Sequence, residues 1–181
     1  MSIHILAVVA SPHASGSTSG AAAAVLAGAE AAGARTNTLD LRTDDSADAV
    51  DRIEAADGVL FASPVYRAAH TSLLGALLER IPRGAVGDDR APLAGKAAAI
   101  LLTGASHHHF LATERLRGTL ASFFAAQTLS PGLYFTPASY TPDKQLVPDA
   151  RELADLHGRA LVDLTTAVRA SKALSALTPL V

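Results

Sequence analysis

The sequence predicts a three-layer α/β fold, in which a parallel sheet of five strands lies between two layers of helices. Apolar segments of strand length alternate along the chain with segments of helical pattern, as expected for parallel strands that helices cover on both faces. Crossovers between parallel strands are right-handed, and the usual order in a small doubly wound sheet is 2-1-3-4-5. No linker or repeat divides the sequence, so we expect a single domain over residues 1–181.

Five segments have the length and composition of strands. The first, third and fourth are almost wholly apolar, the second alternates in polarity, and the fifth is interrupted by Pro131 and Gly132. The predicted strands cover residues 3–10, 35–41, 58–62, 96–103 and 127–135. In such a sheet a ligand binds beyond the carboxyl ends of the strands, so the loops after the first, third and fourth strands are the candidate site.

Helical patterns separate the strands. Residues 21–32 are rich in alanine, and Gly33 stands where a helix-ending glycine is expected. Further helices are predicted over residues 46–56, 72–81 and 110–125 and from Pro148 onward. The apolar stripes that should face the core are Leu73, Leu74, Leu77, Leu78 and Ile81, then Leu116, Leu120 and Phe124, and finally Leu153, Leu156, Leu161, Leu164 and Val168. The tail after about residue 171 is expected to be loose or to contact another subunit.

Composition excludes several classes of protein. With 49% hydrophobic and 18% charged residues, the chain is too apolar to be disordered and long enough to bury a core. A net charge of −2 without a basic block argues against nucleic acid or an anionic membrane as partner. The absence of cysteine excludes disulfides, thiolate metal sites and dithiol redox chemistry. The strongest apolar stretch, residues 97–102, is too short to cross a membrane, so we expect a cytoplasmic protein.

The first loop is rich in hydroxyl groups and precedes a helix. Five hydroxyl side chains occur between residues 10 and 20, namely Ser11, Ser15, Ser17, Thr18 and Ser19. Free N–H groups at a helix start favour an anion, and His13 adds a donor that can carry charge. The pattern suits a phosphate monoester but lacks the Walker and G-x-G-x-x-G motifs. The alternative is a helix cap within an ordinary polar loop.

The second and third loops suit a flat ring. In residues 63–70, Pro64 stiffens the turn and Tyr66 offers an apolar face, although a simple surface turn explains them equally well. In residues 103–109, small residues allow close approach of a ligand to the backbone. The three adjacent histidines there point in different directions and make a poor metal site, so we predict no metal. Without a G-x-S-x-G elbow or paired carboxylates, the chemistry is expected to come from a cofactor.

Together these loops resemble the NADPH-dependent FMN reductases of the flavodoxin-like superfamily, in particular the alkanesulfonate-type reductases of two-component flavin systems. The resemblance runs from Ile3 to about Tyr140. The segments that carry it are Ala10-Ser11-Pro12 with the hydroxyls at 17–19, Ala56-Asp57-Gly58 leading into residues 63–69, Leu93-Ala94-Gly95-Lys96, and Thr103-Gly104-Ala105-Ser106.

The resemblance implies FMN and NADPH as cofactor and substrate. It implies that Ser11, Ser17, Thr18 and Ser19 hold the FMN phosphate, that Pro64, Val65, Tyr66 and Arg67 run along the isoalloxazine, and that Thr103, Gly104, Ala105 and Ser106 approach the ring. His13 stands where the family usually has an arginine. Because an imidazole is only partly charged at neutral pH, we expect weaker or pH-dependent FMN binding. Arg67 is the candidate that steers the NADPH phosphates; the alternative is an exposed arginine without a ligand.

The helix after His109 departs from the family in one respect. Some two-component reductases carry an extra aromatic residue there, which distorts the helix at a subunit interface. Here residues 110–114 run directly into Arg115-Leu116-Arg117, which favours a tightly bound FMN over strict flavin release.

The expected function is therefore NAD(P)H-dependent reduction of FMN by hydride transfer from NADPH, with reduced flavin passing to a flavin-dependent monooxygenase or to oxygen. The alternatives are an FMN-retaining quinone, azo-dye or metal-ion reductase, a non-catalytic flavodoxin-like electron carrier, and a domain that binds a phosphorylated ligand without catalysis. The resemblance also implies a homodimer or tetramer.

Overall fold

The computed structural model of the chain describes residues 2–14, 16–44, 48–84, 87 and 89–179. The strands in this part of the chain are β1 (His4–Val9), β2 (Arg35–Asp40), β3 (Gly58–Pro64), β4 (Ala97–Thr103), β5 (Gln127–Thr128) and β6 (Leu133–Phe135). The helices are α1 (Ser17–Ala31), α2 (Ala49–Ala55), α3 (Ser72–Arg80), α4 (Ala112–Gly118), α5 (Pro148–Ala170) and α6 (Lys172–Ser175).

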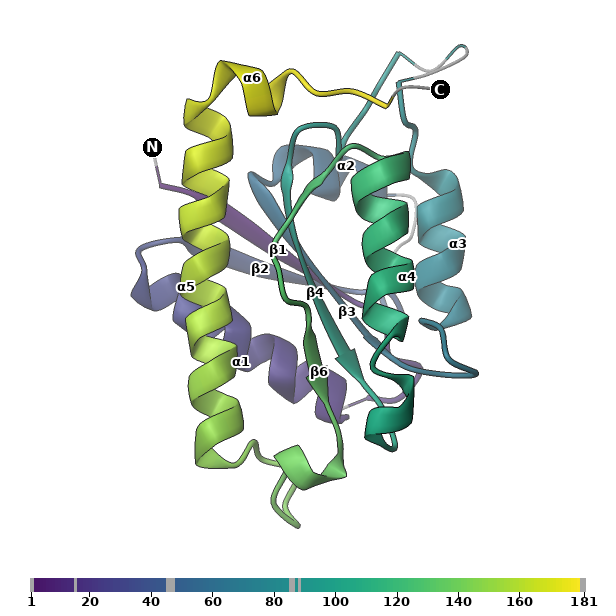
Figure 1. Cartoon of the computed structure of the whole chain (residues 1–181), viewed down its shortest axis with the longest axis vertical. Helices are drawn as coiled ribbons and strands as arrows, with labels where there is room; N and C mark the ends of the chain where they lie inside the picture. Colours follow the sequence, from purple (N-terminus) through teal and green to yellow (C-terminus); the bar gives the residue numbers. More distant parts are fainter. Residues whose placement is uncertain (1, 15, 45–47, 85–86, 88, 180–181) are drawn as a thin grey trace.

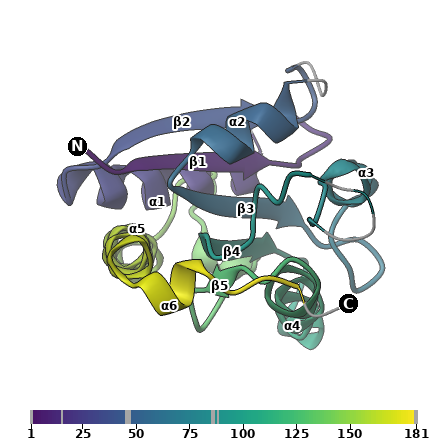
Figure 2. The ribbon, with the colours of Figure 1, turned by 90° about the horizontal axis from the view of Figure 1, so that it is seen from above.

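The predicted layers and strand order are confirmed. A parallel sheet runs through the centre of the molecule in the order β2-β1-β3-β4-β5 (Figure 1). Figure 2 shows α1 and α5 on one face of the sheet and α2, α3 and α4 on the other. The core divides in the same way: Leu6 and Val8 of β1 pack in the α2–α4 layer, whereas Ile5 and Ala7 pack with α1 and α5.

The predicted fifth strand consists of two short segments. β5 and β6 both pair in parallel with β4, and Pro131 and Gly132 lie between them. Proline lacks the N–H that a strand ladder requires. The interruption predicted from Pro131 and Gly132 is therefore confirmed.

Two helices begin at other residues than predicted. α1 begins at Ser17, four residues before the predicted start, because the chain enters the helix directly after Gly16, whose backbone is extended (φ −85°, ψ 170°). Ser17, Thr18 and Ser19 therefore lie on the first helical turn, where N–H groups lack helical partners and short polar side chains are well tolerated. The predicted helix 46–56 is observed as α2, Ala49–Ala55; residues 46 and 47 lie outside the described residues.

The helix predicted over residues 110–125 is observed over residues 112–123, but it is not a single regular α-helix. A 3-10 turn, His107–His109, comes first, and α4 continues into a π-helical segment, Thr119–Phe123. The N–H of Phe124 donates to the carbonyl of Thr119, five residues earlier, at 3.2 Å. In a regular helix, side chains four residues apart drift by about 40° per step. The wider π turn keeps Leu116, Leu120 and Phe124 buried together, as the stripe predicted.

The predicted apolar stripe of α5 is only partly correct. Leu161 and Val168 are buried, but Leu153 and Leu156 are 42% and 52% exposed. The buried face is made instead of Ala150, Ala154, Gly158, Leu161, Val162, Thr165 and Val168. Small residues are required because α1 approaches very closely: a Cβ on Gly158 would lie 1.9 Å from the carbonyl oxygen of Val25. A Cβ on Gly28 of α1 would likewise lie 2.1 Å from the carbonyl oxygen of Asp155.

The tail after α5 lies against the amino-terminal edge of the sheet. Ser171 caps α6 by accepting a hydrogen bond from the N–H of Leu174 at 3.2 Å. A Cβ on Gly95, in the turn before β4, would lie 2.6 Å from the carbonyl oxygen of Ser175. Among the described helices, none has the length and apolar character needed to cross a membrane.

Candidate functional site

A cavity of about 480 Å³ opens at the carboxyl ends of the strands. Four segments form its walls: the start of α1, the loop after β3, the loop after β4 and the loop after β6. The lining residues are Ser17, Pro64, Val65, Tyr66, Thr103, Gly104, Ala105, Phe135, Thr136, Pro137, Tyr140, Thr141 and Lys144. Seven of the predicted site residues, Ser17 and those at 64–66 and 103–105, are among them.

The other predicted site residues lie around the cavity without lining it. They are Ser11, His13, Thr18, Ser19, Arg67 and Ser106. Ser11 is buried, and its hydroxyl donates to the carbonyl oxygen of His13 at 3.1 Å, which shapes the turn. His13 is exposed.

The start of α1 is open to an anion. Gly16 provides no side-chain cap, and no acidic residue lies in the first turn. The helix is 15 residues long, so its dipole places partial positive charge at Ser17. The unpaired N–H groups of this turn are the donors that a phosphate group would accept.

The first and third loops are joined by a buried threonine pair. The hydroxyl oxygens of Thr18 and Thr103 are 2.6 Å apart, and the two side chains are 3% and 9% exposed. The Thr18 hydroxyl therefore already has a partner within the protein. A phosphate contact for Thr18 stays a prediction.

The second loop is a tight turn that two hydrogen bonds donated by Thr71 hold in place. The hydroxyl of Thr71 donates to the carbonyl oxygen of Ala10 at 2.8 Å, and its N–H donates to the hydroxyl oxygen of Ser63 at 3.0 Å. At the tip, the N–H of Tyr66 donates to the carbonyl oxygen of Ala69 at 2.9 Å, and the reverse bond is 3.1 Å.

The tip of this loop is strained. Arg67 and Ala68 both have positive φ, 52° and 60°, as in a type I′ turn that normally selects glycine or asparagine. Side chains in this left-handed region raise the energy of the backbone, and such conformations concentrate at ligand-binding loops. Tyr66 is 48% exposed at the cavity mouth.

The third loop lines the cavity at Gly104 and packs closely against Tyr134. A Cβ on Gly104 would lie 1.8 Å from the hydroxyl oxygen of Tyr134, so a larger residue would require Tyr134 or the loop to move. The Tyr134 hydroxyl donates to the carbonyl oxygen of Ser106 at 2.8 Å, and partial burial raises the pKa of Tyr134.

Sequence reasoning missed the wall after β6. Tyr140 closes the cavity on this side, and its hydroxyl donates to the carbonyl oxygen of Ser17 at 3.1 Å. Burial raises the pKa of Tyr140 well above its usual range. The rule that ligands bind beyond strand ends also holds for the fifth strand, so the position of this loop is the signal that could have identified it.

His107, His108 and His109 are exposed in their 3-10 turn. Within the described part of the chain, no three histidine, aspartate or glutamate side chains gather as a metal site would require. The cavity instead combines an open helix start, a close backbone approach and an aromatic side chain. Among its described lining residues none is acidic. This set fits a ligand with an anionic end and a flat ring.

Comparisons with known proteins agree with this chemistry. The sequence profile of a family described as NADPH-dependent FMN reductase matches residues 3–140. A Pseudomonas aeruginosa protein named FMN reductase (NADPH) is 37% identical over 91 residues, which are 50% of this chain and 45% of that protein. The NADH-dependent FMN reductase SfnF of Pseudomonas putida is 38% identical over 82 residues, or 45% of this chain and 40% of that protein. The matched segment thus spans less than half of either relative.

Among solved structures, the apo form of the NADH:FMN oxidoreductase EMOB superposes with a TM-score of 0.78 at 23% identity, covering 97% of this chain and 95% of that one. At this identity the likeness shows the fold, which is flavodoxin-like.

Proposed function

This chain belongs to the NADPH-dependent FMN reductase family, and on that premise we propose that it is an NAD(P)H-dependent FMN reductase that binds FMN in the cavity at the strand ends. Bound FMN supplies the hydride-accepting ring of such a reaction. The observation that carries the proposal is the cavity itself, in which the open start of α1 and the accessible backbone at Gly104 line one space.

The residues of the cavity bind and orient rather than transfer protons. We assign the phosphate to Ser17 and the first turn of α1, with Ser11, His13, Thr18 and Ser19 around it. Residues 64–67 would then lie along the ring and residues 103–106 at its edge. Among the described lining residues there is no carboxylate or imidazole, so positioning and exclusion of water are what these side chains contribute.

We assign Arg67 to the phosphates of NAD(P)H. It lies at the exposed tip of the second loop, next to Tyr66 at the cavity mouth, and a guanidinium pairs with phosphate through two hydrogen bonds. The named relatives include both an NADPH-dependent and an NADH-dependent enzyme, so both nucleotides belong in the test.

Reduced flavin has two candidate fates. It can leave for a flavin-dependent monooxygenase, or it can stay bound and reduce a quinone, an azo dye or a metal ion. By sequence alone, the missing aromatic insertion after His109 favours retention of the bound FMN. The helix contains a π-helical segment without that insertion, so the absence of the insertion does not separate the two fates. We place the reaction in the cytoplasm, where reduced nicotinamide nucleotides are abundant.

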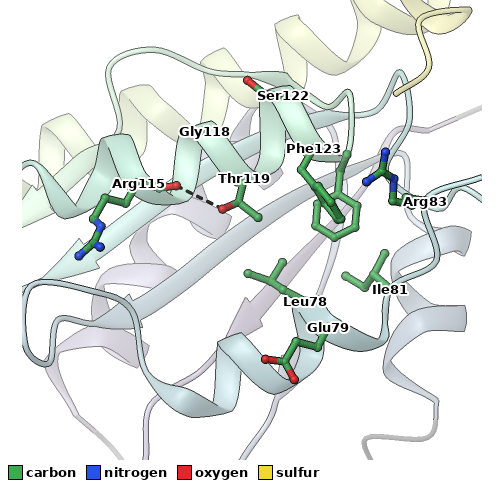
Figure 3. A pocket seen from close by; sticks show the side chains of 10 residues that line it. Leu78, Glu79, Ile81, Arg83, Arg115, Gly118, Thr119, Ser122 and Phe123 are labelled. Atoms are coloured by element: carbon green, nitrogen blue, oxygen red, sulfur yellow. Dashed lines mark hydrogen bonds between the residues drawn. The ribbon is translucent and has the colours of Figure 1, made fainter. Parts of the chain in front are cut away.

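We further propose that the chain forms a homodimer or tetramer through the α3–α4 face. A second cavity of about 890 Å³ lies there, between Leu78 and Ile81 on one side and the π-helical segment on the other (Figure 3). Phe123 lines this cavity and is 46% exposed, and an exposed apolar cavity wall is typical of an interaction surface. Phe110 and Leu111, just before α4, are 53% and 58% exposed. Arg83 lies over the ring of Phe123, 4.1 Å from its centre.

The reductase proposal is tested by following the absorbance of NADPH or NADH mixed with the purified full chain, with and without FMN. Oxidation that requires added FMN and saturates with it supports a flavin reductase that releases its product. Oxidation by a yellow protein without added FMN, accelerated by quinones, supports the FMN-retaining reductase. The absence of oxidation in both conditions contradicts both and leaves the carrier or the binding domain.

A further inference from the structure

Lys144 is the one cationic side chain among the described residues that line the cavity. It has no role in the function proposed above. Its backbone has a positive φ of 61°, a conformation that side chains other than glycine rarely adopt. A strained residue kept at a cavity wall is a reason to look for a binding role.

A small hairpin fixes the position of Lys144. Tyr140 and Leu146 form an antiparallel bridge, the N–H of Thr141 donates to the carbonyl oxygen of Gln145 at 2.8 Å, and the N–H of Lys144 donates to the carbonyl oxygen of Thr141 at 2.9 Å. The strained conformation is therefore held by the turn on both sides.

The hairpin is attached to the start of α1. The hydroxyl of Tyr140 bonds the carbonyl oxygen of Ser17 at 3.1 Å, and the ring of Tyr140 packs edge-on against Phe135 with centroids 6.4 Å apart. Lys144 and Ser17 line the same cavity. Lys144 and the start of α1, where the helix dipole is positive, thus border one space.

The charge of Lys144 is not neutralised by a described neighbour. Arg52, Arg117, Arg159 and Arg169 all form ion pairs with acidic side chains. Within the described part of the chain, no carboxylate oxygen lies within 4.0 Å of the Lys144 ammonium group. His13, the other basic group expected near the phosphate, is exposed and does not line the cavity.

We propose that Lys144 binds the phosphate monoester of FMN together with the first turn of α1. The proposal rests on FMN binding in this cavity, as argued above. A lysine ammonium binds phosphate as a compact point charge. Lys144 would thereby make FMN binding less dependent on His13 than the sequence predicted.

The test compares FMN with riboflavin, which has the same ring but no phosphate. Dissociation constants of both flavins are measured by fluorescence titration for the wild type, Lys144→Ala, Lys144→Arg and the control Lys172→Ala, whose exposed side chain lies in α6. We expect Lys144→Ala to weaken FMN about tenfold, as for one charge-assisted bond, and to leave riboflavin unchanged. Lys144→Arg should stay within about threefold of the wild type, and Lys172→Ala should bind both flavins like the wild type. The salt dependence of FMN binding should fall in Lys144→Ala.

Three results would overturn the assignment. Unchanged FMN affinity in Lys144→Ala excludes a phosphate contact. An equal loss for FMN and riboflavin indicates that the substitution disturbs the hairpin, which the melting temperature of the variant would also show. If Lys144→Ala raises only the KM for NADPH and leaves FMN affinity and the KM for NADH unchanged, Lys144 binds the nucleotide and not FMN. If the wild type binds neither flavin, the FMN reductase proposal itself fails, and this is visible before any variant is compared.

Discussion

The two edges of the sheet use polar groups in opposite ways. At the amino-terminal edge, Asp57 accepts the N–H of His4 at 2.8 Å and pairs with Arg169. Lys96 donates to the carbonyl oxygens of Ile53 and Glu54 at 2.6 and 2.9 Å, at the end of α2. The charged groups of Asp57 and Lys96 thus have their partners within the protein. At the carboxyl-terminal edge, buried hydroxyls join the loops to one another, while the helix start and the backbone at the cavity stay open.

Backbone conformation differs in the same sense. The turns that lead into β2 and β4 at the amino-terminal edge place glycines, Gly33 and Gly95, at positive φ; Ala125, before β5, departs from this rule. At the carboxyl-terminal edge the residues with positive φ are Arg67, Ala68 and Lys144, which keep side chains at some cost in stability. The comparison indicates that one edge is arranged for stability and the other for binding, and substitutions can test each half.

The largest effect is expected at Gly104. In Gly104→Ala the new Cβ would meet the Tyr134 hydroxyl oxygen at 1.8 Å and Cζ at 2.6 Å, which forces the third loop away from its position. We expect FMN affinity to fall about 30-fold, or about 2 kcal/mol, measured by fluorescence titration. Gly118→Ala, where no atom lies within 4 Å of the added Cβ, is the matched control. Wild-type affinity in Gly104→Ala would show that the loop is not part of the site.

The counterpart at the amino-terminal edge is Gly58. A Cβ there would lie 2.4 Å from Oγ1 of Thr165 and 2.9 Å from Cδ1 of Ile5, and such overpacking costs about 1–3 kcal/mol. Urea denaturation of Gly58→Ala should show this loss, while the folded fraction binds FMN like the wild type. Adding Thr165→Ala, which removes the nearest atom, should recover part of the stability. A weakened FMN affinity in folded Gly58→Ala would contradict the conclusion that the amino-terminal edge serves stability and not binding.

A smaller effect is expected from the threonine pair that joins the first and third loops. Thr18→Val removes a buried hydrogen bond to Thr103, and we expect a loss of about 1 kcal/mol in the free energy of unfolding. Thr103→Val should cost a similar amount, and the double variant less than the sum of the two. Titration with FMN and riboflavin then separates the roles of Thr18. A loss specific to FMN would mean that its hydroxyl also contacts the phosphate.

The last prediction concerns Lys96, whose effect on stability depends on pH. Burial lowers the pKa of Lys96 to about 8, whereas an unfolded lysine titrates near pH ~10.4. Between these values the unfolded chain binds more protons, so stability rises with pH across the window and is constant below it. Lys96→Met lacks this gain. Across this pH window, the urea midpoint of the wild type should therefore rise relative to that of Lys96→Met. Parallel curves of midpoint against pH for the two proteins would contradict the assignment.

The sequence was sufficient for the parts of the fold that depend on pattern. Apolar runs located the strands, and Pro131 and Gly132 located the break in the last one. Features set by helix packing could not be read in the same way. The exposure of Leu153 and Leu156 follows from how closely α1 and α5 approach, which the periodicity of either helix does not contain. The π-helical segment likewise results from the fit of three core side chains.

The candidate site divides along a similar line. The residues at 64–66 and 103–105 follow strand ends, and the sequence placed them correctly around one cavity. The partner of a hydroxyl is a tertiary fact, so the pairing of Thr18 with Thr103 was not foreseen. Tyr140 and Lys144 follow the strand that is broken in two, and their segment carries no glycine-rich or hydroxyl-rich signature to mark it.

Gly28 and Gly158 bring the backbones of α1 and α5 into direct contact. Sliding or tilting one of these helices would require the other to move with it, so the pair behaves as one rigid body. The two cavity walls that this pair carries, Ser17 at the start of α1 and the segment of Tyr140 before α5, therefore keep a constant separation. The opposite wall is carried by the second loop, which belongs to neither helix and whose tip exposes Arg67.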